Sequence, residues 1–255
     1  MAYKIAAANI KGGIGKSSLS LNLADQLIKR GKRVLMVDFD PQRNTTAVYR
    51  AATANVPTMY DIIFSNYKAE DCIQHTEYGD IIPNDVLLKN ADGSIKQGPG
   101  MYKIIKKALV SIEDQYDYII FDTPPHDGIL LGNALMAADG VIVPIECDLF
   151  GIQGLYDFYS TLKEFQEDNE KLRILGVLKV KYKKNQNLTK DLEEKTLPKY
   201  ASDMSTKIFK TAIRESVKCK EAITGRMRLS KYAPGSTVES DFSDLTDEVL
   251  KEVEA

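Results

Sequence analysis

A glycine-rich segment near the N-terminus limits the folds open to this chain more than any other feature. Residues 10–18 read I-K-G-G-I-G-K-S-S and lie between an apolar run at 5–8 and an amphipathic run that begins near Leu19. Strand, glycine loop and helix in this order are typical of a phosphate-binding loop, because glycines let backbone N–H groups turn inward and the helix start adds partial positive charge. We therefore expect a polyphosphate to bind in this loop.

Two side chains at the end of the loop suit the same chemistry. Lys16 is placed to reach the β- and γ-phosphates, and the Ser17 hydroxyl is placed to bind Mg²⁺. The segment departs from the common pattern G-x-x-x-x-G-K-[ST], because Lys11 stands where that pattern has its first glycine. A second lysine therefore enters the loop, unless Lys11 is only a solvated residue beside a glycine turn.

The pattern K-G-G-x-G-K-[ST] resembles the deviant Walker A motif of the ParA/MinD class of P-loop ATPases. The resemblance implies ATP and Mg²⁺ as cofactors, and catalytic roles for Lys11 and Lys16. It also implies that Lys11 reaches across a nucleotide-sandwich homodimer to the partner's phosphates. The nucleotide-binding residues implied are Lys11, Gly12, Gly13, Ile14, Gly15, Lys16, Ser17 and Ser18.

Length and charge fit one α/β domain over residues 1–255. A chain of 255 residues can bury roughly 70–75% of its unfolded surface, which needs no disulfide or metal. Lys and Arg total 34 against 36 for Asp and Glu, so a basic surface must be local. The three cysteines lack C-x-x-C spacing, and there is neither a cleavable signal pattern nor a membrane-length apolar run. We expect a cytoplasmic protein.

Short apolar runs alternate with amphipathic segments along the chain. Strands are predicted at 3–8, 34–37, 118–121, 141–145 and 174–180, and helices at 18–31, 129–138, 154–166 and 188–200. This order predicts a doubly wound α/β fold of the P-loop NTPase type, with a mostly parallel sheet and helices on both faces. Such folds bind ligands at the carboxyl ends of their strands.

Two aspartates follow the second predicted strand, in the segment V-D-F-D-P-Q-R-N. The segment is similar to the family signature D-x-D-P-Q-G-N, with Arg43 in place of the glycine. By that resemblance Asp40 is the catalytic base that orients or deprotonates the attacking water, and Asp38 supports the Mg²⁺ shell. The alternative is that both aspartates cap a helix that starts near Asn44.

A third aspartate, Asp122, follows the apolar run at 118–121 and precedes Thr-Pro-Pro. This is a Walker B arrangement, in which Asp122 holds Mg²⁺, usually through water. It also resembles the family's D-x-P-P switch segment. His126 is left out of the site, because a lone histidine in a turn is more often solvated. The segment 141–155 resembles a family strand and loop that lead to a dimer-facing helix.

The region from 53 to 115 is less informative. Helices are expected at 58–64 and 101–111, and a short strand at 80–82. Turn-forming residues at 92–100 predict an exposed loop.

The segment 209–222 aligns without gaps with the I-P-R-N-V-R-x-x-E-A segment of Soj-like partition ATPases. Lys218 then falls on an arginine that contacts nonspecific DNA in that family, and Asn185 on the other such arginine. The DNA-binding residues expected are Lys183, Lys184, Lys218 and Lys220, within a basic stripe that also includes Lys181 and Lys190. The alternative is a set of solvated lysines. The family's Pro-Arg-Asn is replaced here by Arg214, Glu215 and Ser216. The adenine contacts that this loop makes in the family are therefore not expected in this chain.

The segment 241–255 has apolar residues at helical spacing among many acidic ones. Such an acidic amphipathic helix is expected to pack on the body of the protein, because an anionic bilayer would repel its polar face. We therefore expect no membrane partner, unlike the MinD branch of the class.

The resemblance as a whole implies an ATPase for partition or segregation of DNA. An ATP-induced homodimer would bind nonspecific double-stranded DNA and associate with the nucleoid. Mg²⁺-dependent hydrolysis to ADP and phosphate, stimulated by a ParB-like centromere-binding protein, would release it. One alternative is a positioning or regulatory ATPase of the same fold that acts on a membrane or protein assembly without binding DNA. Another is a reductase component like the nitrogenase iron protein, although no C-G-G-type cluster segment accompanies Cys147.

Overall fold

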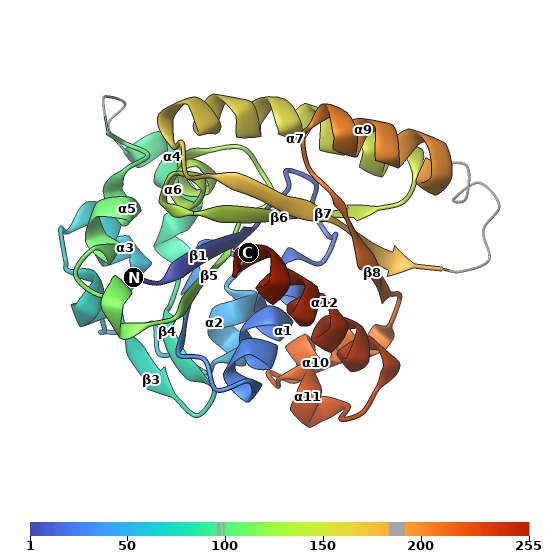
Figure 1. Cartoon of the computed structure of the whole chain (residues 1–255). Helices are drawn as coiled ribbons and strands as arrows, with labels where there is room; N and C mark the ends of the chain where they lie inside the picture. Colours follow the sequence, from blue (N-terminus) through green and yellow to red (C-terminus); the bar gives the residue numbers. More distant parts are fainter. Residues whose placement is uncertain (96–97, 99, 184–191, 255) are drawn as a thin grey trace.

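The computed structural model describes residues 1–95, 98, 100–183 and 192–254 of the chain. The described residues form an eight-stranded sheet of order β3-β4-β2-β5-β1-β6-β7-β8, drawn in Figure 1. The β3–β4 pair is antiparallel and the other neighbouring pairs are parallel. The strands are β1 (Tyr3–Ala7), β2 (Val34–Asp38), β3 (Gln74–Thr76), β4 (Gly79–Ile82), β5 (Tyr118–Asp122), β6 (Gly140–Glu146), β7 (Arg173–Tyr182) and β8 (Ile208–Arg214).

Most connections between the strands contain helices. The α-helices are α1 (Lys16–Lys29), α2 (Asn44–Val48), α3 (Met59–Phe64), α4 (Ala91–Ser94), α5 (Ile104–Leu109), α6 (Ile129–Ala137), α7 (Leu149–Asp168), α9 (Leu197–Asp203), α10 (Val217–Thr224), α11 (Leu229–Tyr232) and α12 (Thr237–Val253). Short 3₁₀ turns lie at Ala69–Cys72, Val86–Asn90 and Glu113–Gln115, and a π turn lies at Leu192–Thr196.

Helices cover both faces of the sheet, as the sequence predicts. All five residues of β2 are buried, and their side chains alternate between two apolar clusters. Leu35 and Val37 belong to the cluster with α3, α5, α6, α7 and α9, whereas Met36 belongs to the cluster with α1, α2, α10, α11 and α12. Figure 1 shows α6 and α7 above the sheet and α1 and α12 below it. The doubly wound prediction is confirmed.

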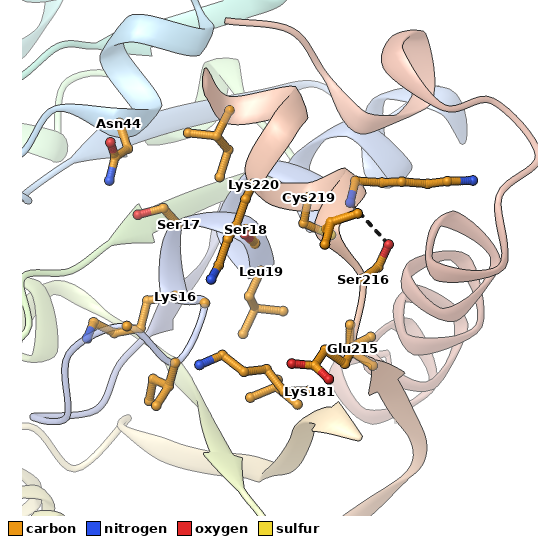
Figure 2. Close-up of a pocket in the computed structure, with 18 of the residues that line it drawn as sticks. Lys16, Ser17, Ser18, Leu19, Asn44, Lys181, Glu215, Ser216, Cys219 and Lys220 are labelled. Carbon is orange, nitrogen blue, oxygen red and sulfur yellow. Dashed lines mark hydrogen bonds between the residues drawn. The ribbon is translucent and has the colours of Figure 1, made fainter. Parts of the chain in front are cut away.

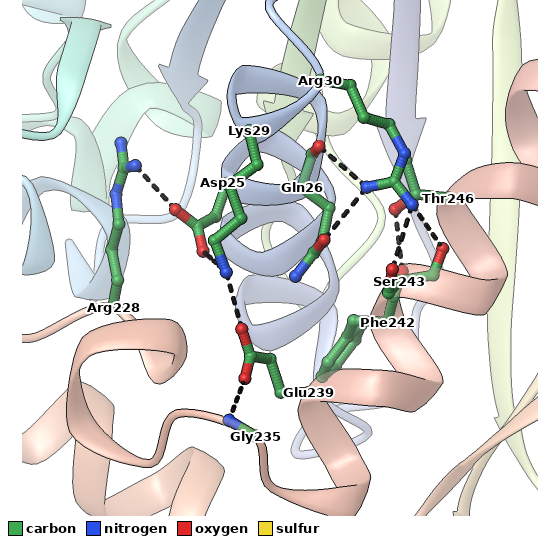
Figure 3. Close-up of polar contacts among 10 residues, drawn as sticks. All are labelled: Asp25, Gln26, Lys29, Arg30, Arg228, Gly235, Glu239, Phe242, Ser243 and Thr246. Carbon is green, nitrogen blue, oxygen red and sulfur yellow. Dashed lines mark hydrogen bonds and ion pairs between the residues drawn. The ribbon is translucent and has the colours of Figure 1, made fainter.

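The C-terminal helix α12 packs on α1, which confirms the expectation drawn from its acidic, amphipathic sequence. Leu245 is 1% exposed and faces the apolar cluster beneath the sheet. Lys29 pairs with Glu239 at 2.6 Å, and Arg30 pairs with Asp247 at 2.7 Å, as Figure 3 shows in part. Among the described residues, no helix combines the length and apolar character needed to cross a membrane.

Several predicted elements differ from the structure, and the helix predicted at 154–166 is part of the longer α7. The loop predicted at 92–100 is wrong for 92–94, which complete α4; residues 96, 97 and 99 lie outside the described residues. The helix predicted at 188–200 falls partly on the undescribed residues 184–191, and its described part continues through α9 to Asp203. The helix predicted at 101–111 spans only α5.

The strand β8 was missing from the prediction for a physical reason. It lies at the edge of the sheet, and only Phe209 and Ile213 of its seven residues are buried. An edge strand exposed in this way has no continuous apolar run to mark it in the sequence.

Packing of α12 on the body can be tested with Leu245→Ala. Removing this side chain leaves a cavity in the core, and we expect the free energy of unfolding to fall by about 2–5 kcal/mol. Urea denaturation followed by circular dichroism measures the change. Lys251→Ala is the matched control on the exposed side of the same helix, with an expected change within about 0.5 kcal/mol. Equal effects of the two substitutions would contradict the packing described here.

Candidate active site

The carboxyl ends of three adjacent strands meet at one edge of the sheet. In the parallel register, Asp38 of β2 lies opposite Asp122 of β5, and Asp122 lies opposite Ala7 of β1. The loops that follow these strands contain the three segments identified in the sequence. The structure therefore brings the glycine loop and both aspartate segments together, as expected for ligand binding in a doubly wound fold.

The glycine loop joins β1 to α1 and presents the first turn of that helix. Gly13 and Gly15 have φ angles of 72° and 86°, in the left-handed region that favours glycine. Gly15 is the N-cap residue of α1, and no described side chain caps the helix there. The first backbone N–H groups of α1 are therefore available to an anion.

Asn9 holds the loop in place, a role that the sequence analysis missed. Its side chain is 1% exposed. The amide nitrogen donates to the carbonyl of Pro144 on β6 at 2.9 Å, and the amide oxygen accepts from the backbone N–H of Lys11 at 3.0 Å. Asn9 thus ties the start of the loop to the neighbouring strand. A single asparagine after an apolar run carries no sequence signal for this contact.

Lys16 is held inside the loop. The residue is 6% exposed, and its ammonium donates to the backbone carbonyl of Lys11 at 3.0 Å. Burial lowers the pKa of Lys16 to about 8, against the opposing influence of Asp122 and Asp40. The two aspartates compensate the charge of the buried ammonium only in part. A bound phosphate would supply the remaining negative charge.

Asp122 is fully buried and has an unused acceptor. Its Oδ2 accepts from the Thr45 hydroxyl at 2.5 Å, while Oδ1 has no hydrogen-bond partner among the described residues. Burial raises the pKa of Asp122, and hydrogen bonds from the Thr45 and Ser17 hydroxyls oppose the rise. An unpaired carboxylate oxygen beside a serine hydroxyl is a donor set that suits Mg²⁺. The residues therefore fit the predicted metal.

A metal here would need ligands beyond the protein. Among the described residues, no group of three or more histidine, cysteine, aspartate or glutamate side chains could hold an ion by itself. Magnesium commonly takes one or two carboxylates together with substrate phosphates and water. Ser17 and Asp122 would hold the ion against a bound polyphosphate.

Asp38 uses both carboxylate oxygens within the protein. Its Oδ2 accepts from the backbone N–H and the hydroxyl of Thr46, at 2.8 and 2.7 Å, and its Oδ1 accepts from the backbone N–H of Asp40 at 3.0 Å. Thr46 lies in the first turn of α2, so Asp38 makes the contact that the capping alternative predicts. Burial and the nearby Asp122 raise the pKa of Asp38. A role in the Mg²⁺ shell remains a proposal.

Asp40 faces the cavity instead of capping α2. Its Oδ1 accepts from the backbone N–H of Gln42 at 2.9 Å, and it lines the same cavity as Lys16. Burial raises the pKa of Asp40. Arg43 accepts the left-handed conformation, with a φ of 58°, at the position where the family signature has glycine. That conformation costs an L-residue roughly 1–2 kcal/mol, and it preserves the turn after Asp40.

Lys11 lies at the edge of the site. Its ammonium is 3.8 Å from Oδ1 of Asp148. Asp148 is the N-cap residue of α7 and accepts from the backbone N–H of Gly151 at 2.6 Å. A Cβ at Gly151 would come within 2.0 Å of the carbonyl oxygen of Glu146, so this tight turn requires glycine.

A cavity of about 1070 Å³ adjoins the glycine loop. One end is lined by residues 13–18 and Asp40, whereas Lys11, Gly12, Asp38 and Asp122 are not among its lining residues. The opposite wall comes from β7, β8, α10 and α12 (Figure 2). Its apolar members are Val180, Ile213, Val217, Ile223 and Phe242. An apolar end beside a phosphate end suits a nucleotide base.

The predicted basic stripe is partly neutralised. Lys181 pairs with Glu146 and Lys183 pairs with Glu215, each at 2.7 Å. Lys218 and Lys220 are both exposed on α10, and both line the cavity. Lys184, Lys190 and Asn185 lie outside the described residues.

Comparison with known proteins places this site in a family. A family model described as an AAA domain matches residues 2–174. The chain is 36% identical over 249 residues to the sporulation initiation inhibitor protein Soj of Bacillus subtilis strain 168, covering 96% of this chain and 97% of that protein. It is 31% identical over 224 residues to the chromosome partitioning protein ParA of Caulobacter vibrioides strain NA1000 / CB15N, covering 86% of this chain and 82% of that protein.

A solved structure supports the fold independently. Cobyrinic acid a,c-diamide synthase from Mycobacterium smegmatis, solved with ADP and magnesium, superposes with a TM-score of 0.84 at 24% identity, covering 100% of this chain and 96% of that one.

The sequence matches confirm the family resemblance that the phosphate loop and the two aspartate segments indicated. The chain belongs to the Soj/ParA family of P-loop ATPases.

Proposed function

We propose that this chain is a DNA partition ATPase that binds ATP and Mg²⁺, dimerises, and holds nonspecific DNA until hydrolysis. The observation that carries the proposal is that buried Asp122 interacts with Lys16 and Ser17 beside the nucleotide cavity, in a chain related to Soj and ParA over most of its length. Family membership supports partition, and the contacts in the cleft support nucleotide chemistry.

Each residue of the site has a distinct role in the proposed hydrolysis. Backbone N–H groups of residues 13–18 bind the phosphates, and Lys16 exchanges the Lys11 carbonyl for phosphate oxygens. Ser17 and Asp122 would hold Mg²⁺, with Asp38 supporting the shell, and the ion would offset charge on the β- and γ-phosphates. Asp40 orients or deprotonates the attacking water, and its raised pKa makes it a better proton acceptor than an exposed carboxylate.

Lys11 could leave its present contact and reach the partner subunit in a homodimer. Its pair with Asp148 is long, at 3.8 Å, and both side chains are partly exposed. An ion pair of this kind contributes less than about 1 kcal/mol, so its loss would oppose dimerisation only weakly. In the dimer, Lys11 contacts the partner's phosphates and makes assembly depend on ATP.

The DNA surface of the dimer uses exposed lysines near the cavity. Lys218 is exposed on α10, and Lys183 at the end of β7 would exchange Glu215 for a DNA phosphate. Lys184, outside the described residues, is included in the proposal. A ParB-like partner stimulates hydrolysis, as an arginine finger does in other P-loop enzymes, and the dimer leaves the nucleoid.

Asp40→Ala tests the proposed cycle. Without the base, ATP turnover should fall about 10²–10⁴-fold, and the ATP-bound dimer should persist on random-sequence duplex DNA. With roughly four to eight phosphate contacts, the logarithm of affinity should fall with the logarithm of salt at a slope of about −4 to −7. Fluorescence anisotropy across a salt series measures the slope, with ADP and acidic liposomes as controls. An ATP-bound dimer with no DNA affinity would favour a positioning or regulatory ATPase instead.

Lys11→Ala tests the cross-interface contact. In the Asp40→Ala background it should abolish ATP-dependent dimerisation, seen by sedimentation velocity, because the partner's phosphates lose their second lysine. Nucleotide binding by the monomer should survive, whereas the comparison variant Lys16→Ala should lose it. Dimerisation and turnover that stayed normal in Lys11→Ala would show that this lysine does not cross the interface.

Lys218→Glu tests the DNA surface. The substitution should weaken DNA binding at least about tenfold and lower the salt slope by about one for each chain, while the dimer still forms at saturating ATP. Lys251→Glu makes the same charge change on the exposed side of α12 and should leave DNA affinity within about twofold. The same anisotropy assay compares them, and equal losses would assign the effect to net charge.

A further inference from the structure

Helix α10 carries a lysine that lines the nucleotide cavity. Lys220 and Ser18 both line the 1070 Å³ cavity, and Figure 2 shows the Lys220 side chain extending from α10 into it, in the direction of Ser18. The sequence places Lys220 with the DNA-binding lysines, because it is two residues from Lys218 on the chain. Lys218 lines the same cavity, but the direction of the Lys220 side chain toward Ser18 points to the nucleotide as its ligand.

Several other polar side chains on this wall already have partners. Arg214 forms a bidentate pair with Asp241, with contacts of 2.9 and 2.5 Å. Glu215 pairs with Lys183, and Lys181 pairs with Glu146, as described above. The Ser216 hydroxyl accepts from the backbone N–H of Lys218 at 3.2 Å and caps α10.

Among the described residues, Lys220 has no such partner, and the same holds for Lys218, which also lines the cavity. Lys220 forms no ion pair or hydrogen bond with another side chain in the part of the chain that the structure describes. Its charge contributes to the lowered pKa of Glu215, a carboxylate that Lys183 already pairs. The ammonium therefore remains available to a ligand in the cavity.

A phosphate bound at the glycine-loop end of the cavity would be a suitable partner for the Lys220 ammonium. Residues 15–18 form the start of α1, where phosphates bind through backbone N–H groups. Lysine is an effective point charge for phosphate, and its four-carbon stem allows it to reach a phosphate from an opposing helix.

We propose that Lys220 binds a phosphate oxygen of the nucleotide in its own chain, on the Ser18 side of the polyphosphate. This assignment rests on the proposed nucleotide binding and moves Lys220 from the DNA surface to the nucleotide site. Lys220 approaches the polyphosphate from α10, across the cavity from the glycine loop.

Isothermal titration calorimetry with Lys220→Met tests the proposal, since methionine keeps the apolar stem and removes the charge. The affinity for ADP and for ATP should fall about tenfold, as for loss of a hydrogen bond to a charged group. Adenosine, which has no phosphate, should bind the variant and the wild type equally within about twofold. Lys220→Arg should keep most of the wild-type affinity, and Lys251→Met, which removes an exposed lysine of α12, should leave it unchanged. Circular dichroism melts confirm that each variant folds.

Unchanged ADP and ATP affinity in Lys220→Met, with tight binding by the wild type, would overturn the role of Lys220 alone. Equal losses for adenosine and ADP would also overturn it, because the effect would then not depend on phosphate. A wild-type protein that bound neither nucleotide would overturn the proposed function as well.

Discussion

Two buried carboxylates face each other across the central strands, and the site depends on how their charge is balanced. The parallel register of β2 and β5 sets Asp38 opposite Asp122, and neither side chain is exposed. Burying two acids together is unfavourable unless hydrogen bonds or cations compensate. Asp38 satisfies both oxygens within the protein, whereas Asp122 leaves one unpaired. Magnesium beside the phosphates would provide the missing compensation.

The same edge of the sheet explains why the glycine loop and the aspartates function as one unit. Lys16 reaches the site from α1, Asp40 from the turn after β2, and Thr45 from the first turn of α2. Each is placed by a short segment that directly follows a buried strand. Small shifts of these strands would therefore displace the phosphate contacts, the metal ligands and the catalytic base together.

Much of this edge could be predicted from the sequence, because each motif is local and follows an apolar run. Lys16, Asp40 and Asp122 needed only their own segments and the parallel order of the strands. The far wall of the cavity could not be predicted, since it depends on where an edge strand and α12 pack. Whether Lys220 faces DNA or the cavity is set by the placement of α10. The pairing of Arg214 with Asp241 joins segments 27 residues apart.

The central claim is that Asp122 helps to hold Mg²⁺ against a bound nucleotide. Titration calorimetry of ADP with and without Mg²⁺, on the wild type and on Asp122→Asn, tests it most directly. The account predicts that Mg²⁺ strengthens ADP binding to the wild type by about tenfold or more and that most of this gain is lost in the variant. An equal gain from Mg²⁺ in both proteins would contradict it.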